Sequence, residues 1–323
     1  MFHSSTQKSH WLFQHRQQLT RQRAETNASF CRKYSDAAIS KECQFLTPTE
    51  EESVCLYYMK KLFEFCNVFR PPVPRGVLGT AGAYFKRFYL LTSVMDYHPK
   101  EIFLSCAYLA FKIEEYNVSL DEFVYMLSPE LRQSSSEMIL NNELMMLKRL
   151  KFHLTIHSPF RPLEGFLIDM KTRSSIPNVE RLRKEADSFL MSSLYSDVLF
   201  LYPPSQIALA ALYYASTVIE VDISSYIKVQ LADTIEQGSK LAYTLQGICD
   251  IVRTVFVPES SQEIAHILQR LEKCSRVVLV SPPTNSKRKS DEVSEVVLRK
   301  KIKEEHDVEE TGLTSLTGFG SLT

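Results

Sequence analysis

The chain has 323 residues, enough for two domains of ordinary size, and its 38 Lys and Arg residues balance its 38 Asp and Glu residues. With a formal net charge of zero, no overall field directs the molecule to nucleic acid or to an acidic membrane surface. The chain contains only 9 glycines, which disfavours β-rich folds and nucleotide-binding loops and favours a mostly helical fold.

The seven cysteines include no CxxC pair and no zinc-site spacing, which predicts a reduced, intracellular protein without a metal. The most apolar stretch, IFLSCAYLAF, is too short to span a bilayer, and the first residues show no signal-peptide pattern. We therefore expect no membrane association.

The first predicted helix covers 10–34, a polar segment rich in Arg and Gln, within an N-terminal extension at 1–47. The second covers 50–69, and either Thr47 or Thr49 can cap it, because a proline and three glutamates follow and suit the first turn of a helix. Apolar residues recur along this segment at helical spacing until RPPVPR ends it.

Four more helices are predicted in the next eighty or so residues. They lie at about 75–90, 99–115, 119–127 and 136–150. The first of them contains three spaced glycines, Gly76, Gly79 and Gly82, but no GxxxxGK[ST] pattern, so close helix packing explains these glycines better than a phosphate loop.

An internal repeat is the most informative feature. A shift of 105 residues places YHPKEIFLSCAYLA (97–110) over YPPSQIALAALYYA (202–215), with six of fourteen positions identical. Each copy puts proline in the first turn of a helix that is apolar all round, as expected of the buried central helix of a bundle. The repeat predicts an all-α fold with two helical domains of similar plan, at 48–157 and 160–257.

The C-terminal part is predicted to contain one more amphipathic helix, 261–275, within a segment that we place at 258–280. From 281 to 323 the charged composition predicts a disordered tail. Two basic clusters in this tail resemble a two-part nuclear import signal, and the alternative is a solvated tail of mixed charge. The clusters consist of Lys287, Arg288 and Lys289 and of Arg299, Lys300 and Lys301.

Glu143 carries a charge on an apolar helix face. The residues three and four positions away from it are all apolar, so its carboxylate is predicted to lie in the middle of a hydrophobic stripe. An unpaired charge there would cost about 3–5 kcal/mol. Glu143 therefore needs a cationic partner or an interface that another chain completes.

Lys112, at the end of helix 99–115, is a candidate partner for Glu143. The alternative is that Lys112 complements its own helix C-terminus or pairs with Glu115. The 105-residue offset puts Thr217 at the position of Lys112 and Ile248 at that of Glu143. Because the second copy replaces both charges, the fold does not require them, which favours a function located in the first domain.

Arg87 is also flanked by apolar residues, and a structural role is predicted for it, with the guanidinium bonded to backbone carbonyls or directed outward. No catalytic motif is present, and the i,i+4 pair His153 and His157 has no carboxylate partner that would favour a metal site. The sequence indicates binding rather than catalysis, without a cofactor.

The segments YFKRFYL, YHPKEIFLSCAYLAFKIEE and NELMMLKRLKFHL together resemble the cyclin box. Three further segments are similar to the cyclins that serve the CDK-activating kinase: SSTQKSHWLF, FHLTIHSPFRPLEGFLIDMKTR and YPPSQIAL. With them, the resemblance covers nearly the whole chain. It implies two tandem five-helix cyclin boxes with flanking N- and C-terminal helices, which are expected to pack together and to help kinase activation.

The resemblance also implies a kinase-binding site. Cyclins use a lysine at the end of the third helix and a glutamate in the fifth to touch the partner kinase, and these positions match Lys112 and Glu143. Apolar contacts to the kinase αC helix are implied for Ile113, Leu147, Phe152 and Leu154.

The implied role is that of a regulatory subunit, not an enzyme. The implied partners are a cyclin-dependent kinase catalytic subunit, a RING-finger assembly factor and the core of the general transcription factor TFIIH. The kinase subunit would phosphorylate the activation loops of other cyclin-dependent kinases and the C-terminal repeats of RNA polymerase II, in the nucleus.

The chain departs from many cyclins at two places. Lys86 stands where they have aspartate before the box arginine, and the MRAIL docking patch is absent from helix 50–69. The alternative function is that of a paired cyclin fold that docks on promoter DNA, which would need a zinc ribbon and a basic surface. Because the chain has neither CxxC nor net positive charge, we expect no direct sequence-specific DNA binding.

Overall fold

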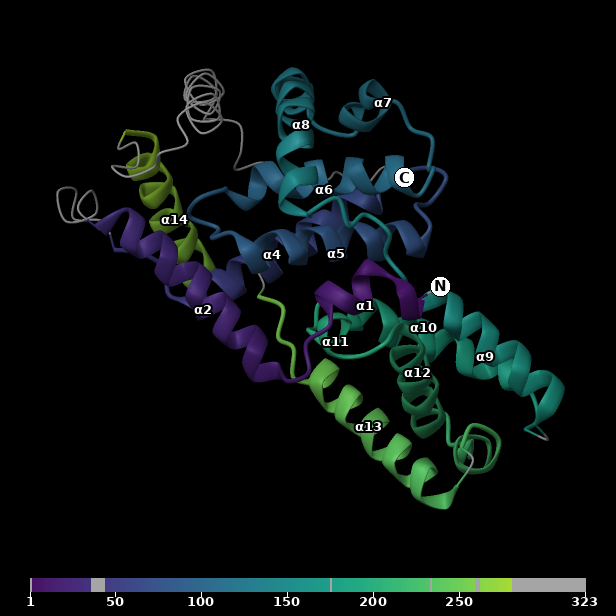
Figure 1. Ribbon diagram of the computed structural model, residues 1–323. Helices are drawn as coiled ribbons and strands as arrows, with labels where there is room; N and C mark the ends of the chain where they lie inside the picture. Colours follow the sequence, from purple (N-terminus) through teal and green to yellow (C-terminus); the bar gives the residue numbers. More distant parts are fainter. Residues whose placement is uncertain (1, 36–43, 175, 233, 259–261, 281–323) are drawn as a thin grey trace.

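The computed structural model describes residues 2–35, 44–174, 176–232, 234–258 and 262–280. These residues form helices joined by turns and loops, and no strand occurs among them. Two helical bundles lie one above the other, with the N-terminal helix α1 between them (Figure 1). None of the described helices combines the length and apolar character needed to cross a membrane.

The first bundle is built around α6, which packs against α4, α5 and α8. Its helices are α4 (Pro48–Cys66), α5 (Arg75–Leu91), α6 (Pro99–Ile113), α7 (Leu120–Tyr125) and α8 (Pro129–Arg149). The start predicted for α8, residue 136, is wrong, because the helix begins at Pro129 and its first two turns are polar and lack the apolar periodicity that the prediction followed.

Helix α4 is capped by Thr47, one of the two threonines that the sequence offers as caps. The Thr47 side chain accepts a hydrogen bond from the backbone N–H of Glu50 (3.3 Å), and the Glu50 carboxylate accepts one from the backbone N–H of Thr47 (2.7 Å). This reciprocal capping box satisfies two backbone donors that a helix start leaves free. Ser119 and Glu122 form the same arrangement at the start of α7.

The second bundle repeats this plan around α12, which packs against α9, α10 and α13. Its elements are α9 (Phe160–Arg173), η2 (Val179–Leu182), α10 (Arg183–Ser193), α11 (Val198–Leu201), α12 (Pro204–Val218), η3 (Tyr226–Gln230) and α13 (Ile235–Arg253). The all-α prediction of two tandem bundles is therefore confirmed.

The central helices α6 and α12 begin and end at corresponding positions of the repeat. Both start and end 105 residues apart, and each is followed by a glutamate in the left-handed region, Glu115 (φ 56°) and Glu220 (φ 57°). The next backbone N–H reaches back over the last turn, from Tyr116 to the Phe111 carbonyl (2.9 Å) and from Val221 to the Ser216 carbonyl (3.0 Å). This is a Schellman motif, formed here without glycine.

The N-terminal extension contains η1 (Phe2–Ser4), α1 (Thr6–Trp11) and α2 (Arg16–Lys33). The prediction of one helix over 10–34 is wrong: Leu12 is extended, and the Phe13 N–H donates to the carbonyl of Phe200 in the second bundle (2.8 Å). A contact with residues far along the chain overrides the local preference for helix at this point.

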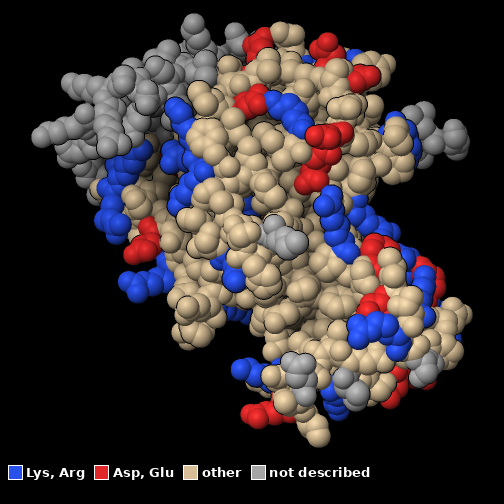
Figure 2. Space-filling view, turned by 45° about the vertical axis from the view of Figure 1, so that its right-hand side comes forward, with Lys and Arg blue, Asp and Glu red and all other residues tan. Residues whose placement is uncertain are grey.

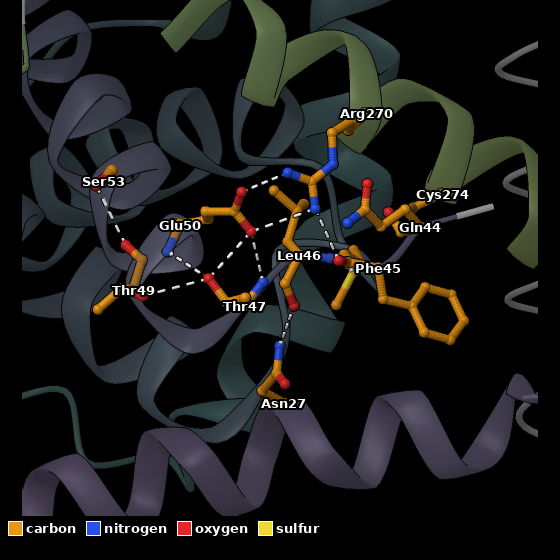
Figure 3. Close-up of polar contacts among 11 residues, drawn as sticks. Asn27, Gln44, Phe45, Leu46, Thr47, Thr49, Glu50, Ser53, Arg270 and Cys274 are labelled. Carbon is orange, nitrogen blue, oxygen red and sulfur yellow. Dashed lines mark hydrogen bonds and ion pairs between the residues drawn. The ribbon is translucent and has the colours of Figure 1, made fainter. Parts of the chain in front are cut away.

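The flanking helices α2 and α14 (Gln262–Val280) are both tied to the segment that enters α4. The Asn27 side chain of α2 donates to the Leu46 carbonyl (2.8 Å), and the Arg270 guanidinium of α14 donates to the Phe45 carbonyl (2.9 Å) and pairs with Glu50 (Figure 3). Residues 44–50 therefore join the two flanking helices to the first bundle.

Helix α2 also connects the two bundles. Its Arg23 forms a bidentate ion pair with Asp197, with both N–O distances 2.7 Å, just before α11. Lys86 of α5 donates to the carbonyl of the neighbouring Ser196, and burial lowers the pKa of its ammonium to about 8. Lys86 thus bonds to the second bundle from the position where many cyclins have aspartate.

Candidate functional site

Lys112 lies in the last turn of α6, and its ammonium forms an ion pair with Glu143 of α8. The ammonium also lies 5.6 Å from the centroid of the Tyr108 ring, one turn back on α6. Within the described part of the chain no ion pair joins Lys112 to Glu115. The structure therefore brings together the two charged residues that the sequence singled out.

The Lys112–Glu143 pair contributes little to stability, because 38% of the Lys112 side chain and 33% of the Glu143 side chain are exposed. Ion pairs of this exposure contribute about 0.2–1 kcal/mol. The pair is therefore not needed to hold α6 and α8 together. Both side chains can be reached from outside, and the second bundle has Thr217 where the first has Lys112.

The prediction that Glu143 lies in the middle of a buried stripe is wrong. Ile139 and Met146 are buried, whereas Leu140 is 56% exposed. Because each residue turns the helix by about 100°, Glu143 lies on the border between a buried stripe and an exposed one. Its carboxylate needs no buried partner, and it remains accessible from outside.

The exposed side of α8 carries two large apolar residues next to Glu143, Leu140 and Leu144, and Leu144 is 57% exposed. Sequence reasoning missed Leu144. The signal was present, since α8 has more apolar residues between positions 138 and 147 than one buried stripe can hold. These residues are Met138, Ile139, Leu140, Leu144, Met145, Met146 and Leu147.

The chain after α8 contains Phe152 and Leu154, two more of the residues that are predicted to contact the kinase. Lys151 and Phe152 both adopt positive φ (55° and 56°), and the Phe152 N–H donates to the Leu147 carbonyl (2.9 Å), which closes a Schellman motif like those after α6 and α12. Phe152 is 62% exposed, and Leu154, two residues later, is half-buried.

The predicted apolar residues thus lie on and around the C-terminal ends of α6 and α8. Ile113, 38% exposed, directly follows Lys112, and Leu147 lies one turn beyond Glu143. An exposed group of large apolar side chains around a half-exposed ion pair is typical of a protein-binding surface. We call the surface formed by Lys112, Ile113, Leu140, Glu143, Leu144, Leu147 and Phe152 the α6/α8 surface.

Arg87 has the structural role that its sequence neighbours indicate. It is 2% exposed, its Nη1 donates to the His153 carbonyl (2.9 Å), and its guanidinium lies 4.7 Å from the centroid of the Trp11 ring. A buried arginine that is bonded in this way fixes the chain after α8 and is not available to a ligand.

Two of the three spaced glycines permit close packing. A Cβ on Gly82 would lie 3.0 Å from the Phe63 ring, and one on Gly79 would lie 3.2 Å from the Ser158 hydroxyl. Gly76 has nothing within 4 Å of that position, so the packing explanation is wrong for it.

No group of three potential metal ligands occurs among the residues that the structure describes. Lys287, Arg288, Lys289, Arg299, Lys300 and Lys301, in the tail, lie outside these residues. In the view of Figure 2, Lys and Arg side chains predominate along the left, both charges are mixed at the lower right, and a wide uncharged area lies between them.

Comparison with known proteins assigns the family. The cyclin N-terminal domain matches residues 26–155, and the cyclin C-terminal domain matches residues 158–279. Cyclin-H of Xenopus laevis is 38% identical over 314 residues, which covers 95% of this chain and 97% of that protein.

Two solved structures are similar. The CAK complex from Chaetomium thermophilum, bound to ATP-gamma-S, contains a chain that matches with a TM-score of 0.75 at 24% identity, covering 90% of this chain and 96% of that one. The yeast TFIIK (Kin28/Ccl1/Tfb3) complex contains one that matches with a TM-score of 0.63 at 26% identity, covering 77% and 99%. With both domains matched and a relative similar along nearly its whole length, this chain belongs to the cyclin family.

Proposed function

We propose that this protein is the regulatory cyclin subunit of a CDK-activating kinase, which binds a cyclin-dependent kinase and holds it in its active conformation. The observation that carries this proposal is the Lys112–Glu143 pair, half-exposed and surrounded by exposed apolar side chains on the first bundle. The similarity to Xenopus Cyclin-H over nearly the full length supports the choice of this branch of the cyclins.

The ion pair suits recognition of a backbone segment. An ammonium has three donors and a carboxylate about four acceptor positions, so both groups retain capacity beyond their mutual contact. Lys112 would donate to main-chain carbonyls, and Glu143 would accept from main-chain N–H groups, in the kinase loop that precedes helix αC. Hydrogen bonds to charged groups are about twice as strong as neutral ones, so the pair can fix this loop firmly.

The apolar part of the α6/α8 surface would bind αC itself. Each large side chain that becomes fully buried contributes about 1.5–3 kcal/mol, and Leu140, Leu144 and Phe152 are each more than half exposed in the free chain. A correctly placed αC completes the Lys–Glu ion pair of the kinase active site. The chain would therefore activate its partner by positioning an element and would take no part in the chemistry.

The complex would contain a RING-finger assembly factor as its third subunit and would join the TFIIH core. Its kinase subunit would phosphorylate activation loops of cyclin-dependent kinases and the C-terminal repeats of RNA polymerase II. The chain would enter the nucleus through the basic clusters at 287–289 and 299–301. The sequence resemblance, together with the similarity to a chain of yeast TFIIK (Kin28/Ccl1/Tfb3), supports this assignment.

A pull-down from nuclear extract with the full chain as bait tests the function. We expect a cyclin-dependent kinase and a RING-finger protein to co-purify stoichiometrically, and Lys112→Ala and Glu143→Ala to lose the kinase while the free variants remain folded. Lys171→Ala is the matched control, because it breaks another exposed pair, with Glu180, on the second bundle. Normal kinase recovery with both site variants would contradict the proposal.

A further inference from the structure

The residues that join the two bundles, 150–159, include the turn that presents Phe152, and we call them the inter-bundle linker. Lys151 and Phe152 are consecutive residues in the left-handed region, which is unfavourable for any residue with a Cβ. The Schellman hydrogen bonds support this conformation only from the side of α8. Other contacts must therefore hold the rest of the linker.

Helix α5 provides contacts on one side of the linker. Arg87 donates to the His153 carbonyl (2.9 Å), and the Tyr84 hydroxyl donates to the Leu154 carbonyl (2.5 Å). Both side chains are buried in the first bundle, so they form a rigid support beneath the backbone on either side of Leu154.

Helix α1 contacts the linker at the side chain of His153 and at the backbone of His157, near the end that leads into α9. The indole Nε1 of Trp11 donates to Nδ1 of His153 (3.1 Å). The Gln7 side chain binds both backbone groups of His157: its Oε1 accepts from the N–H (2.7 Å), and its Nε2 donates to the carbonyl (3.4 Å). Gln7 is 4% exposed and Trp11 is 3% exposed, so these bonds are shielded from water.

The contacts of α1 and α5 converge on one stretch of the linker. The guanidinium of Arg87, which holds the His153 carbonyl, also lies against the Trp11 ring, so one layer contains α5, Trp11 and His153. Phe152 directly precedes His153 in the chain. The backbone N–H of His153 also donates to the Leu150 carbonyl (3.0 Å), so the contacts of α1 and α5 with His153 act on the same turn that the end of α8 holds from the other side.

We propose that α1 is a brace that positions the kinase-contacting turn, and that Trp11 and Gln7 are the positioning residues; this inference rests on the proposed kinase-binding function. The brace touches no partner itself. It keeps the inter-bundle linker in the conformation in which Phe152 and Leu154 face the kinase, so that binding need not order the linker. Ordering that is already present in the free protein favours affinity.

The position of Trp11 offers a direct readout, because it is the only tryptophan in the chain. In Gln7→Ala, we expect the Trp11 emission to shift to the red and acrylamide to quench it more, as α1 leaves the linker. The kinase dissociation constant should rise in parallel by roughly 3- to 10-fold, the effect of losing about one buried hydrogen bond. Lys8→Ala is the matched control on the same helix, since Lys8 is exposed and its ammonium bonds to His3, outside the linker.

Trp11→Phe removes the N–H donor to His153 together with the five-membered ring of the indole, and leaves a smaller aromatic ring beside Arg87. Its effect on kinase affinity should largely disappear when Phe152 is already Ala, because the brace acts through Phe152. Additive effects of Trp11→Phe and Phe152→Ala would overturn the inference, as would unchanged affinity of Gln7→Ala despite a shifted emission.

The same measurements separate this inference from the proposed function. If Phe152→Ala and Lys112→Ala bind the kinase as tightly as the wild type, the kinase-binding function itself fails. If those two variants bind weakly and the Gln7 and Trp11 variants bind normally, only the brace fails. Circular dichroism of each variant checks that the bundles remain folded.

Discussion

Exchanging the charges of the ion pair on the α6/α8 surface tests whether it serves the fold or the partner. In the double variant Lys112→Glu/Glu143→Lys, the two side chains can still pair across α6 and α8, because one is still a carboxylate and the other an ammonium. Given the exposure of both side chains, each single alanine variant should lower the free energy of unfolding by only about 0.2–1 kcal/mol, and the double reversal should lower it by less.

Kinase binding should respond very differently. If Lys112 faces main-chain carbonyls and Glu143 faces main-chain N–H groups, reversal puts like partial charges against each other, and the loss should be about 2–5 kcal/mol. That corresponds to a dissociation constant roughly 30- to 5,000-fold higher. The single reversals should lose comparable affinity, so that the second reversal does not rescue the first.

Titration calorimetry with the purified kinase subunit measures the affinity, and phosphorylation of a peptide with the polymerase heptad repeat measures the activation. Urea unfolding of the free variants measures the structural contribution. Restoration of affinity and activation in the double reversal would refute the reasoning, because it would show that only the bond between α6 and α8 matters.

Two further predictions concern the first bundle. Glu51 is buried with hydrogen bonds from Asn27 (3.2 Å) and Ser93, and burial raises its pKa to about 7. Because the folded protein binds this proton more tightly than the unfolded chain does, the free energy of unfolding should fall by about 2–4 kcal/mol as the pH rises from about 4.5 through 7. Thermal or urea unfolding measures this fall, which the wild type should show and Glu51→Gln should not. Gly82→Ala should destabilise the chain by about 1–3 kcal/mol, because the added Cβ would lie 3.0 Å from the Phe63 ring. Gly76→Ala, whose added Cβ has nothing within 4 Å, should stabilise the chain by about 0.5–1 kcal/mol. Equal melting temperatures for the two alanine variants would contradict this explanation.

Local patterns were sufficient for much of the fold. The cap of α4 and the proline at the start of α6 depend on interactions within a few residues, so the sequence located the start of α6 and placed the start of α4 to within two residues. The repeat predicted that α6 and α12 are the central helices, because a helix that is apolar all round must be covered on all sides. The Lys112–Glu143 pair was also foreseen, but only as one of several possible arrangements.

Other features depend on residues that are distant in the chain. The break between α1 and α2 has no local signal and follows from the bond between Phe13 and Phe200. Which apolar residues of α8 are covered depends on where α6 lies, so the exposure of Leu140 and Leu144 could not be read from their types. The contact between Trp11 and His153 joins residues 142 positions apart.

The order of the residues was sufficient to predict a pair of helical bundles in which Lys112 and Glu143 of the first copy align with uncharged residues of the second. Periodicity and caps depend on neighbouring residues, and the repeat can be read by comparing the chain with itself, so no knowledge of packing is needed for that conclusion. The packing of the helices was needed to learn that Lys112 and Glu143 lie half-exposed beside exposed leucines, and that α1 contacts the linker beside them. Exposure is set by packing between elements, and packing is decided when the whole chain folds.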